Sequence, residues 1–467
     1  MTLGDDKKRS DENNLQPFKE DANSGFTKKK VSGTGWRLLK RIRVKAALSN
    51  VLRLLYPFYQ SPTAAMEAER ERLKKVACAT IDAAADDLAA LSAGIWEHPE
   101  LNFEEHHAHK VLADFLERHG FETQRSYKLE TAFRASHGSR AHGPNVTFIC
   151  EYDALPEIGH ACGHNLIAEL GVAAGLGLKA AIEASGKPLG QVTVVGTPAE
   201  EGGGGKGKLI EHGAFDDVDV AMMSHPFPAN DAKPRALAIE IFEVVYRGQE
   251  SHAAGYPWKG VNALDAAVMC YQGLACLRQQ CMPDWRIHCI ILEGGVKVNV
   301  IPAKTRLHVG IRAPTDAQLA RLKEKAMNVI EAAAKATECQ FEHSVITKYA
   351  SVLHNGVLAD LYSANLSDVQ AERGPEAYKE APGSTDMGDV SHVLPAIHPM
   401  FYIGGTAVNH TRAFTADSGA ACAQMYTLAQ AKALALTGVD ILTDPSLMDA
   451  ITADFRRGLK EEQETAK

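Results

Sequence analysis

Short apolar runs alternate with helical segments through the first half of the chain. Residues 145–152, 191–196 and 218–224 are apolar, rich in β-branched side chains and bounded by turn-forming residues, which predicts buried strands. Residues 165–185 and 206–212 carry apolar side chains at helical spacing and predict helices. Because alternating strands and helices are typical of α/β domains, we expect a parallel sheet covered by helices.

The order of the elements changes after about residue 235. The patterns predict strands at 238–247, 286–292, 305–312 and 340–349, and helices at 261–278 and 316–336. This β-α-β-β-α-β order is that of a ferredoxin-like unit, which forms a domain in its own right. The α/β alternation then resumes with a strand at 400–403 and a helix at 416–436. We therefore expect a domain at 235–349 inserted into a larger domain made of 66–234 and 350–467.

The first 65 residues differ from the rest of the chain. Residues 1–25 are polar and without pattern, which predicts disorder. From Ala22 to Met66 there is no acidic residue, and nine basic residues alternate with apolar ones. One interpretation is a basic amphipathic helix at 28–56 that makes weak contact with an anionic membrane surface. The alternative, which we favour, is an extension that docks on the protein or stays loose.

Composition and charge exclude several classes of protein. Of the 467 residues, 45% are hydrophobic and 23% charged, as in ordinary globular domains. The net charge of −8 gives no electrostatic reason to expect nucleic acid as a partner. No uninterrupted apolar run approaches the roughly 20 residues that span a bilayer. The nine scattered cysteines, without a C-x-x-C pair or a secretory leader, predict a cytoplasmic protein.

The first residues that could carry chemistry follow the strand predicted at 145–152. The run E-Y-D-A-L-P starts at Glu151, and H-A-C-G-H-N follows it closely. In the second run, Cys162 and His164 lie two positions apart on a glycine turn, where open α/β sheets place ligand sites. A thiolate and an imidazole are both good zinc ligands. Taken alone, such a triplet is more often a buried cysteine beside a structural histidine.

A pair of adjacent carboxylates, Glu200 and Glu201, follows the strand predicted at 191–196 and precedes four glycines. Such pairs usually form a solvated, charged turn. In metal-assisted hydrolysis, by contrast, one carboxylate binds a cation while its neighbour transfers a proton. The glycines also fit G-x-x-x-x-G-K, but Leu209 stands where a phosphate-binding loop needs Ser or Thr, so we reject a nucleotide site.

Two more histidines occupy comparable positions. His225 ends an apolar strand, and His410 follows the glycine pair Gly404-Gly405. Each alone is more often structural than a ligand, but the chain now offers five potential donors, which exceed the four ligands of a structural zinc ion. They suit a two-metal site with a bridging ligand. These donors are Cys162, His164, Glu201, His225 and His410.

In this order, the motifs D-A-L-P, C-G-H, E-E, H-P and a C-terminal N-H resemble the co-catalytic zinc aminoacylase/carboxypeptidase metallopeptidase family, in its amidohydrolase branch. The resemblance runs from about Val76 to the C-terminal end and is strongest to the Xaa-Arg dipeptidase (β-alanyl-lysine dipeptidase) group. It implies a parallel-sheet zinc-peptidase domain with an inserted ferredoxin-like lid and dimerisation domain. It also implies two zinc ions per subunit, with manganese or cobalt as alternatives. One departure is Asn165, where many members of the branch have Asp.

The resemblance assigns roles residue by residue. The five donors match metal ligands, Glu200 matches the general base, and Asp153 is expected to orient a ligand. In the inserted domain, His252 matches a histidine that reaches the reacting carbonyl, in many members from the partner subunit of a dimer. Residues that match or are assigned to substrate binding are Asn299, Arg312, Gly404 and Gly405.

The expected function is a homodimeric, metal-dependent dipeptidase that hydrolyses the amide bond before a C-terminal basic residue, as in β-alanyl-Lys or Xaa-Arg. An alternative in the same chemical class is an N-acyl-amino-acid or p-aminobenzoyl-glutamate amidohydrolase. A third hypothesis, from another class, is a catalytically inactive binding or scaffold relative. The retention of Glu200 and all five donors argues against that third hypothesis.

Overall fold

The computed structural model describes residues 62–369, 375 and 383–464. Ala65–Lys467 form one compact unit. The amphipathic segment proposed at 28–56 lies outside the described residues.

The body is built on a six-stranded sheet in the order β1-β2-β4-β3-β5-β11. Neighbours among β4, β3, β5 and β11 are parallel, whereas β1 and β2 pair antiparallel with their neighbours. The prediction of a parallel sheet is confirmed for β4, β3, β5 and β11, whereas the edge strands β1 and β2 depart from it. The strands are β1 Glu122–Arg125, β2 Phe133–Gly138, β3 Asn145–Cys150, β4 Gln191–Gly196, β5 Val220–Met222 and β11 Ala396–Ile397.

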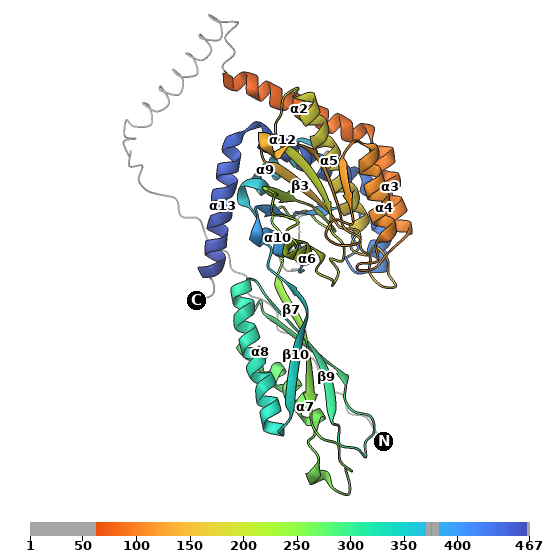
Figure 1. The fold of residues 1–467 in the computed structure, drawn as a ribbon, viewed down its shortest axis with the longest axis vertical. Coiled ribbons are helices and arrows are strands. Elements are labelled where there is room, and N and C mark those ends of the chain that lie inside the picture. Colours follow the sequence, from red (N-terminus) through yellow and green to blue (C-terminus); the bar gives the residue numbers. More distant parts are fainter. Residues whose placement is uncertain (1–61, 370–374, 376–382, 465–467) are drawn as a thin grey trace, which may run out of the picture. The chain divides into compact units, whose positions relative to one another are not determined.

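Helices cover this sheet (Figure 1). Gly120 follows α4 with a φ of 75°, as expected for a glycine that closes a helix. The helix predicted at 416–436 is divided in two by a short break. The helices are α2 Pro62–Ala83, α3 Ala85–Glu97, α4 His106–Arg118, α5 His164–Ala184, α6 Gly205–Glu211, α9 Gly356–Val369, α10 Met387–Val393, α11 Arg412–Ser418, α12 Ala423–Thr443 and α13 Pro445–Glu464.

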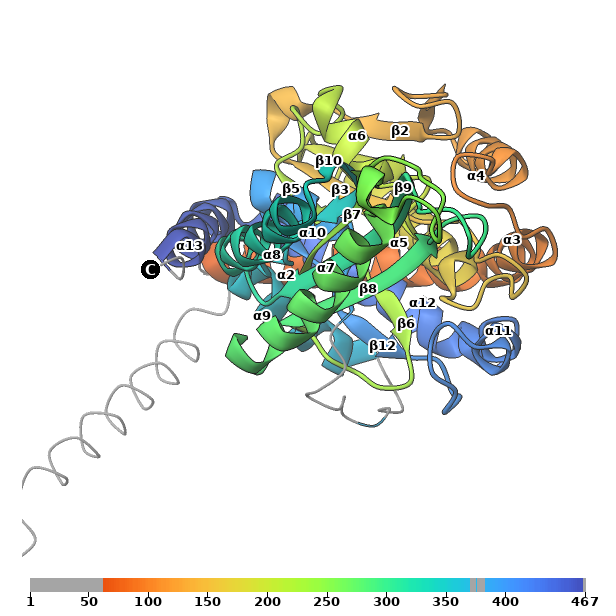
Figure 2. The same cartoon turned by 90° about the horizontal axis from the view of Figure 1, so that it is seen from below.

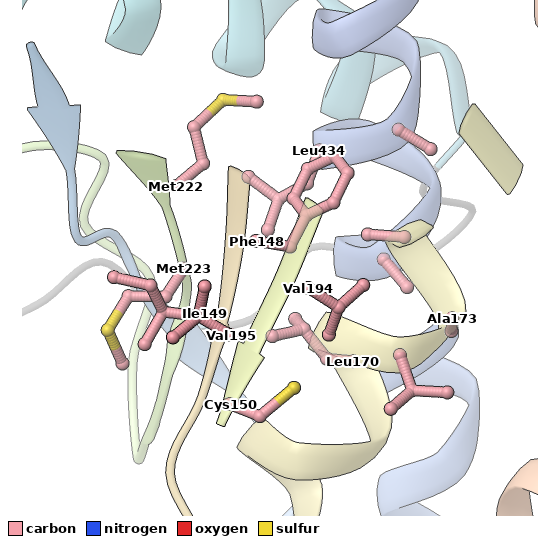
Figure 3. Packing of buried hydrophobic residues seen from close by; sticks show 14 of the residues in the cluster. Phe148, Ile149, Cys150, Leu170, Ala173, Val194, Val195, Met222, Met223 and Leu434 are labelled. Atoms are coloured by element: carbon pink, nitrogen blue, oxygen red, sulfur yellow. The ribbon is translucent and has the colours of Figure 1, made fainter. Parts of the chain in front are cut away.

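The core of the body lies where α5 and α12 pack against the strands. Phe148 and Val194 of the sheet face Leu170 of α5 and Leu434 of α12, and all four are fully buried (Figure 3). Among the described helices, α5 alone has the length and hydropathy of a membrane span, but 89% of its apolar window is buried inside the protein. A core helix of a globular domain has the same properties.

A second, four-stranded antiparallel sheet has the order β10-β7-β9-β8. Helices α7 and α8 lie side by side on one face of it (Figures 1 and 2) and enclose a separate hydrophobic core. All six elements predicted between 235 and 349 are present, with ends that differ by at most two residues. They are β7 Ala238–Arg247, α7 Ala263–Leu277, β8 Arg286–Glu293, β9 Lys304–Ala313, α8 Asp316–Thr337 and β10 Gln340–Tyr349.

A two-stranded parallel ladder joins β6 (His225–Phe227) to β12 (Met400–Tyr402). The strand predicted at 400–403 therefore pairs outside the main sheet, whose last strand is β11. Short 3-10 turns lie at Arg140–His142, Pro257–Lys259 and Arg278–Gln280.

Candidate metal centre

The candidate site lies where strands of the body end. Glu151 and Asp153 follow β3, the pair Glu200-Glu201 follows β4, and His225 begins β6 directly after β5. Because β3, β4 and β5 are neighbouring parallel strands, their carboxyl ends meet at one edge of the sheet. The fold thus brings together side chains that are far apart in the sequence.

All five predicted donors converge, and they form two groups that share one thiol. The ligand atoms of each group lie within 4.8 Å of one another. Cys162 Sγ is 3.4 Å from His225 Nε2, and His410 Nε2 is 3.5 Å from a Glu201 oxygen. A thiolate common to both groups is the arrangement that two neighbouring cations need. The groups are Cys162, His164 and His225, and Cys162, Glu201 and His410.

Hydrogen bonds on the far side of two imidazoles orient them toward this centre. His164 Nδ1 is 3.0 Å from Asp153 Oδ1, and His225 Nδ1 is 2.8 Å from the carbonyl oxygen of Pro226. Each Nδ1 donates in these bonds, and in a neutral ring the lone pair then lies on Nε2, which is directed at the centre. The contact with Asp153 is the one that its predicted orienting role requires.

The protonation states of the donors also suit cations. Burial lowers the pKa of His225 to about 4, so its imidazole is neutral at pH 7. Burial raises the pKa of the Cys162 thiol, which would not ionise without a positive charge beside it. Among the described residues, His164 Nε2 and Glu201 Oε1 are buried without a hydrogen-bond partner. Such atoms are costly to bury unless an ion binds them.

The carboxylate pair occupies a tightly held loop. Ala199 has a φ of 62°, a conformation that is strained for any residue with a Cβ and is found mainly at functional sites. Its N–H donates to Glu105 Oε1 at 2.9 Å, and the Glu201 N–H donates to Asp153 Oδ2 at 2.9 Å. The hydroxyl of Tyr349, at the end of β10, donates to the carbonyl oxygen of Glu200 at 2.7 Å.

Within this loop the two carboxylates have different environments. Burial raises the pKa of Glu200 well above its usual value, and the charges of Glu151 and Glu201 raise it further. Burial also acts on Glu201, but the hydrogen bond from His410 and the charge of His164 hold its pKa below the usual value. Glu200 is therefore suited to holding a proton and Glu201 to remaining charged.

A buried ion-pair cluster beside the donors was not predicted. Lys206, which is fully buried, places Nζ 2.5 Å from Glu151 Oε1 and 2.5 Å from Asp386 Oδ1. The lysine of the G-x-x-x-x-G-K pattern is Lys208, and the sequence analysis assigned no role to Lys206. A charged residue directly after a buried strand, as Glu151 is after β3, was the available signal.

Arg312, near the end of β9, has no carboxylate partner among the described residues. It is half-buried and donates to Ser384 Oγ at 3.1 Å, and it forms no ion pair within the described part of the chain. The hydrogen bond with Glu201 raises the pKa of His410, and the charge of Arg312 opposes this rise. An arginine in this position can receive a carboxylate from outside the protein.

The other predicted residues of the inserted segment are not part of this cluster. His252 and Asn299 are exposed and adjacent, since the Ala253 N–H donates to the Asn299 carbonyl oxygen at 3.1 Å. His252 belongs to none of the ligand groups found among the described residues.

The predicted glycine pair precedes His410 and lies in a loop that requires small residues. Gly404 has a φ of 96°, and a Cβ on Gly405 would lie 2.0 Å from the Asp417 carboxylate.

Comparison with known proteins agrees with this geometry. Residues 148–431 match peptidase family M20/M25/M40. The chain belongs to this family. It is 48% identical over 415 residues to the Xaa-Arg dipeptidase of Mus musculus, covering 86% of this chain and 96% of the relative.

Two more distant relatives extend the comparison. The chain is 30% identical over 431 residues to one of the subunits of the Escherichia coli p-aminobenzoyl-glutamate hydrolase, with 76% of this chain and 89% of the relative covered. A dinuclear metal-binding M20 peptidase from Bacillus subtilis has the same fold, with a TM-score of 0.59 and 21% identity over 78% of this chain and 100% of its own.

Proposed function

We propose that the protein is a metal-dependent dipeptidase that hydrolyses dipeptides with a C-terminal basic residue, such as β-alanyl-Lys or an Xaa-Arg dipeptide. The observation that carries the reaction type is the pair of donor groups sharing Cys162, with the buried carboxyl of Glu200 beside them. The 48% identity to an Xaa-Arg dipeptidase supports the substrate class.

We propose two zinc ions as the cofactor, with cobalt or manganese as alternatives. Thiolate and imidazole ligands favour zinc and cobalt over magnesium, which prefers oxygen. Charge balance favours two ions rather than one, because five buried or nearly buried carboxylates lie in or next to the site and Lys206 provides the one buried ammonium among the described residues. These carboxylates belong to Glu151, Asp153, Glu200, Glu201 and Asp386.

In the proposed mechanism, bound zinc supplies Lewis acidity and lowers the pKa of water at the site. Glu200 accepts a proton from the attacking water and returns it to the nitrogen of the leaving residue. The Asp153 hydrogen bond keeps His164 in the tautomer that leaves Nε2 free. Arg312 binds the terminal carboxylate, and His252 donates a hydrogen bond to the carbonyl oxygen as negative charge develops on it. Asn299, which lies next to His252, assists in binding the carboxylate from the same chain as His252. Gly404 and Gly405 allow the substrate to approach the loop backbone closely.

We further propose that residues 235–349 are a ferredoxin-like lid through which two chains form a homodimer, with His252 acting in the partner's site. The edge strand β8 and the neighbouring helix α7 support this, because both expose large apolar side chains. These are Val268, Met269, Tyr271, Ile290 and Leu292. All nine cysteines are free, which supports a cytoplasmic location. The membrane contact of residues 28–56 stays a proposal.

A panel of dipeptides tests the function. Purified protein loaded with zinc, cobalt or manganese is assayed with β-alanyl-Lys, Ala-Arg, β-alanyl-Ala, β-alanyl-Glu and p-aminobenzoyl-glutamate. We expect kcat/KM to be highest for the two substrates with a basic C-terminal residue and activity to vanish on chelation. Preference for p-aminobenzoyl-glutamate would replace the proposal by the amidohydrolase alternative, and no hydrolysis of any substrate would contradict both.

A further inference from the structure

The connection between α3 and α4 ends at residues 103–105, which contact the loop that carries the carboxylate pair, residues 197–204. We propose that Glu105 is a positioning residue that holds Ala199 in its left-handed conformation and thereby directs the side chain of Glu200 toward the centre. The inference rests on the proposed function, in which Glu200 transfers the proton. It assigns a role to a segment for which no role was predicted from the sequence.

The first support is the way in which the N–H groups at the start of α4 find their acceptors. A residue at the N-cap position usually accepts from the N–H groups of its own first turn. Glu105 is the N-cap residue of α4, but its side chain makes no capping hydrogen bond to this helix, which lies wholly within the described residues. Glu100 accepts instead from His107 N–H at 2.8 Å and from Ala108 N–H at 3.0 Å. The carboxylate of Glu105 is therefore available to another part of the molecule.

The second support is the set of donors that the carboxylate of Glu105 meets. This side chain is fully buried, and both of its oxygens accept hydrogen bonds. Oε1 accepts from the N–H groups of Ala199 and Phe103, each at 2.9 Å, and Oε2 accepts from the hydroxyl of Thr131 at 2.8 Å. A buried carboxylate is costly unless its oxygens accept such bonds. Phe103 and Thr131 thus fix the carboxylate, and the N–H of Ala199 meets an acceptor that cannot move away.

The third support is the backbone of Ala199 itself. Its φ of 62° is sparsely populated by residues with a Cβ and persists only where the surroundings impose it. A hydrogen bond from its N–H to a fixed oxygen is such a constraint. Because Ala199 directly precedes Glu200, its backbone angles set the direction in which the Glu200 side chain leaves the chain. In this arrangement the ligand atoms of His164, Glu200 and Glu201 lie within 4.8 Å of one another.

The same segment also packs against the far end of the loop. A Cβ on Gly203 would lie 2.6 Å from Phe103 Cε2 and 2.5 Å from the Cβ of Ala199, so this glycine leaves room for both side chains. Lys208 Nζ lies 4.1 Å from the centre of the Phe103 ring, a cation–π contact that holds the ring in place. Residues 103–105 therefore contact the loop on both sides of the carboxylate pair.

The test compares Glu105→Ala with Glu100→Ala in the full chain, since each change removes a buried or half-buried carboxylate that accepts two backbone N–H groups. For Glu105→Ala we expect kcat to fall by roughly tenfold or more, because a small displacement of a catalytic group is costly. KM and metal content should stay near those of the wild type. Glu100→Ala is the matched control for lost stability: its Tm should fall, and its kcat should stay near that of the wild type.

Hydrogen–deuterium exchange of the backbone amides of residues 197–204, measured by mass spectrometry, gives a second readout. These amides should exchange faster in Glu105→Ala and at the wild-type rate in Glu100→Ala. Because exchange is measured without substrate, its outcome does not depend on whether the wild type hydrolyses dipeptides.

Two further variants separate positioning from a purely structural role. Glu105→Gln keeps a carbonyl oxygen for Ala199 N–H, and the hydroxyl of Thr131 can turn to accept from the new amide, so kcat should stay close to that of the wild type. Glu105→Asp keeps the charge on a side chain too short to reach Ala199 and Thr131 together. It should reproduce the fall in kcat and the faster exchange even if Glu105→Ala does not fold.

Three outcomes would overturn the proposal. The first is wild-type kcat and exchange in Glu105→Ala or Glu105→Asp. The second is an equal fall in kcat in Glu105→Ala and Glu100→Ala, which would reduce the role of Glu105 to general stability. The third is a fall in kcat for Glu105→Gln as large as that for Glu105→Ala, since the amide retains the acceptor on which the proposal depends.

Discussion

Glu200 and Glu201 are neighbours in the sequence, but only the carboxylate of Glu201 contacts a donor histidine, His410. Glu200→Gln keeps the shape of the side chain and removes its proton acceptor, so we expect kcat to fall by roughly 100-fold or more while metal content stays near that of the wild type. Glu201→Gln removes a charged ligand, so we expect it to lose metal first. Steady-state kinetics and elemental analysis of both variants measure the difference.

Equal loss of metal from both variants would show that these roles are wrongly divided. Asp87→Asn, an exposed change on α3, is the control for metal lost during purification. It should change neither kcat nor metal content.

Arg312 offers a second prediction at the scale of single residues, because it is half-buried and donates to a neutral hydroxyl, that of Ser384. Charge-assisted hydrogen bonds contribute about 1.5–3 kcal/mol each, so a bidentate pair with a substrate carboxylate corresponds to a hundredfold or more in kcat/KM. Amidating the C-terminus of the dipeptide should therefore cost the wild type at least that factor. The same amidation should cost Arg312→Ala little more. Equal cleavage of free and amidated dipeptides by the wild type would refute the carboxylate clamp.

Contacts between side chains could be predicted from the sequence where the residues belong to one local motif. Contacts between residues that only the tertiary fold brings together were missed. Cys162 and His164 are two positions apart after a recognisable strand, so their convergence could be expected. Lys206, by contrast, meets partners that lie 55 and 180 positions away, Glu151 and Asp386. No local pattern specifies such a contact, because it depends on how β3, α6 and α10 pack together.

At the scale of elements, α5 is apolar almost throughout but contains the fully buried Glu169. Burial raises the pKa of Glu169 to about 8 from 4.5, so the folded protein keeps this carboxyl protonated where the unfolded chain ionises it. Stability contributed by this group is therefore present below pH 4.5 and is lost as the pH rises toward 8. Glu169→Gln lacks this titrating group. Its free energy of unfolding should therefore rise relative to that of the wild type by at most about 1.4 kcal/mol per pH unit between pH 4.5 and 8.

Urea unfolding of the two proteins at pH 5, 6.5 and 8 measures this difference, in which the pH effects common to both cancel. Glu183→Gln, at the exposed C-terminal end of the same helix, is the control. Its free energy of unfolding should change with pH in the same way as that of the wild type. A difference between Glu169→Gln and the wild type that does not change with pH would contradict the prediction.

Elements were predicted best where hydrophobic spacing alone determines them. The strands and helices between 235 and 349 have regular apolar positions, and their ends were found within two residues. The strand β1 has the sequence E-T-Q-R and exposes three of its four residues. It therefore has no pattern of apolar positions from which a strand could be predicted. Its antiparallel pairing with β2 depends on tertiary contacts, so the prediction of a parallel sheet did not include this edge.

At the scale of the whole molecule, the proposed homodimer predicts complementation. His252 is exposed and belongs to none of the ligand groups found among the described residues of its own chain. If it acts in the partner's site, mixing inactive His252→Ala with inactive Glu200→Gln should restore about a quarter of wild-type activity at equal ratio, because half of the dimers are mixed and each holds one intact site. Activity is measured after the exchange of chains between dimers has been confirmed by native mass spectrometry.

A mixture of Glu200→Gln and Glu201→Gln is the control. Both changes affect the same loop of the site, so every site in a mixed dimer contains one altered residue and no activity should be restored. Absence of recovery in the His252→Ala mixture, with exchange confirmed, would leave His252 acting within its own chain or not at all.

The hydroxyls of Thr347 and Tyr349 donate to the backbone of the loop that carries the carboxylate pair, at Gly202 and Glu200. The last residues of β10 are thus shared: they end the second sheet and hold the Glu200 loop of the body. Anyone grafting the inserted segment of a relative onto this chain must therefore keep the last three residues of β10 from the recipient. A junction placed before Thr347 preserves both hydroxyls with the loop that they support, whereas a junction at residue 350 imports them from the relative and leaves the Glu200 loop dependent on foreign side chains.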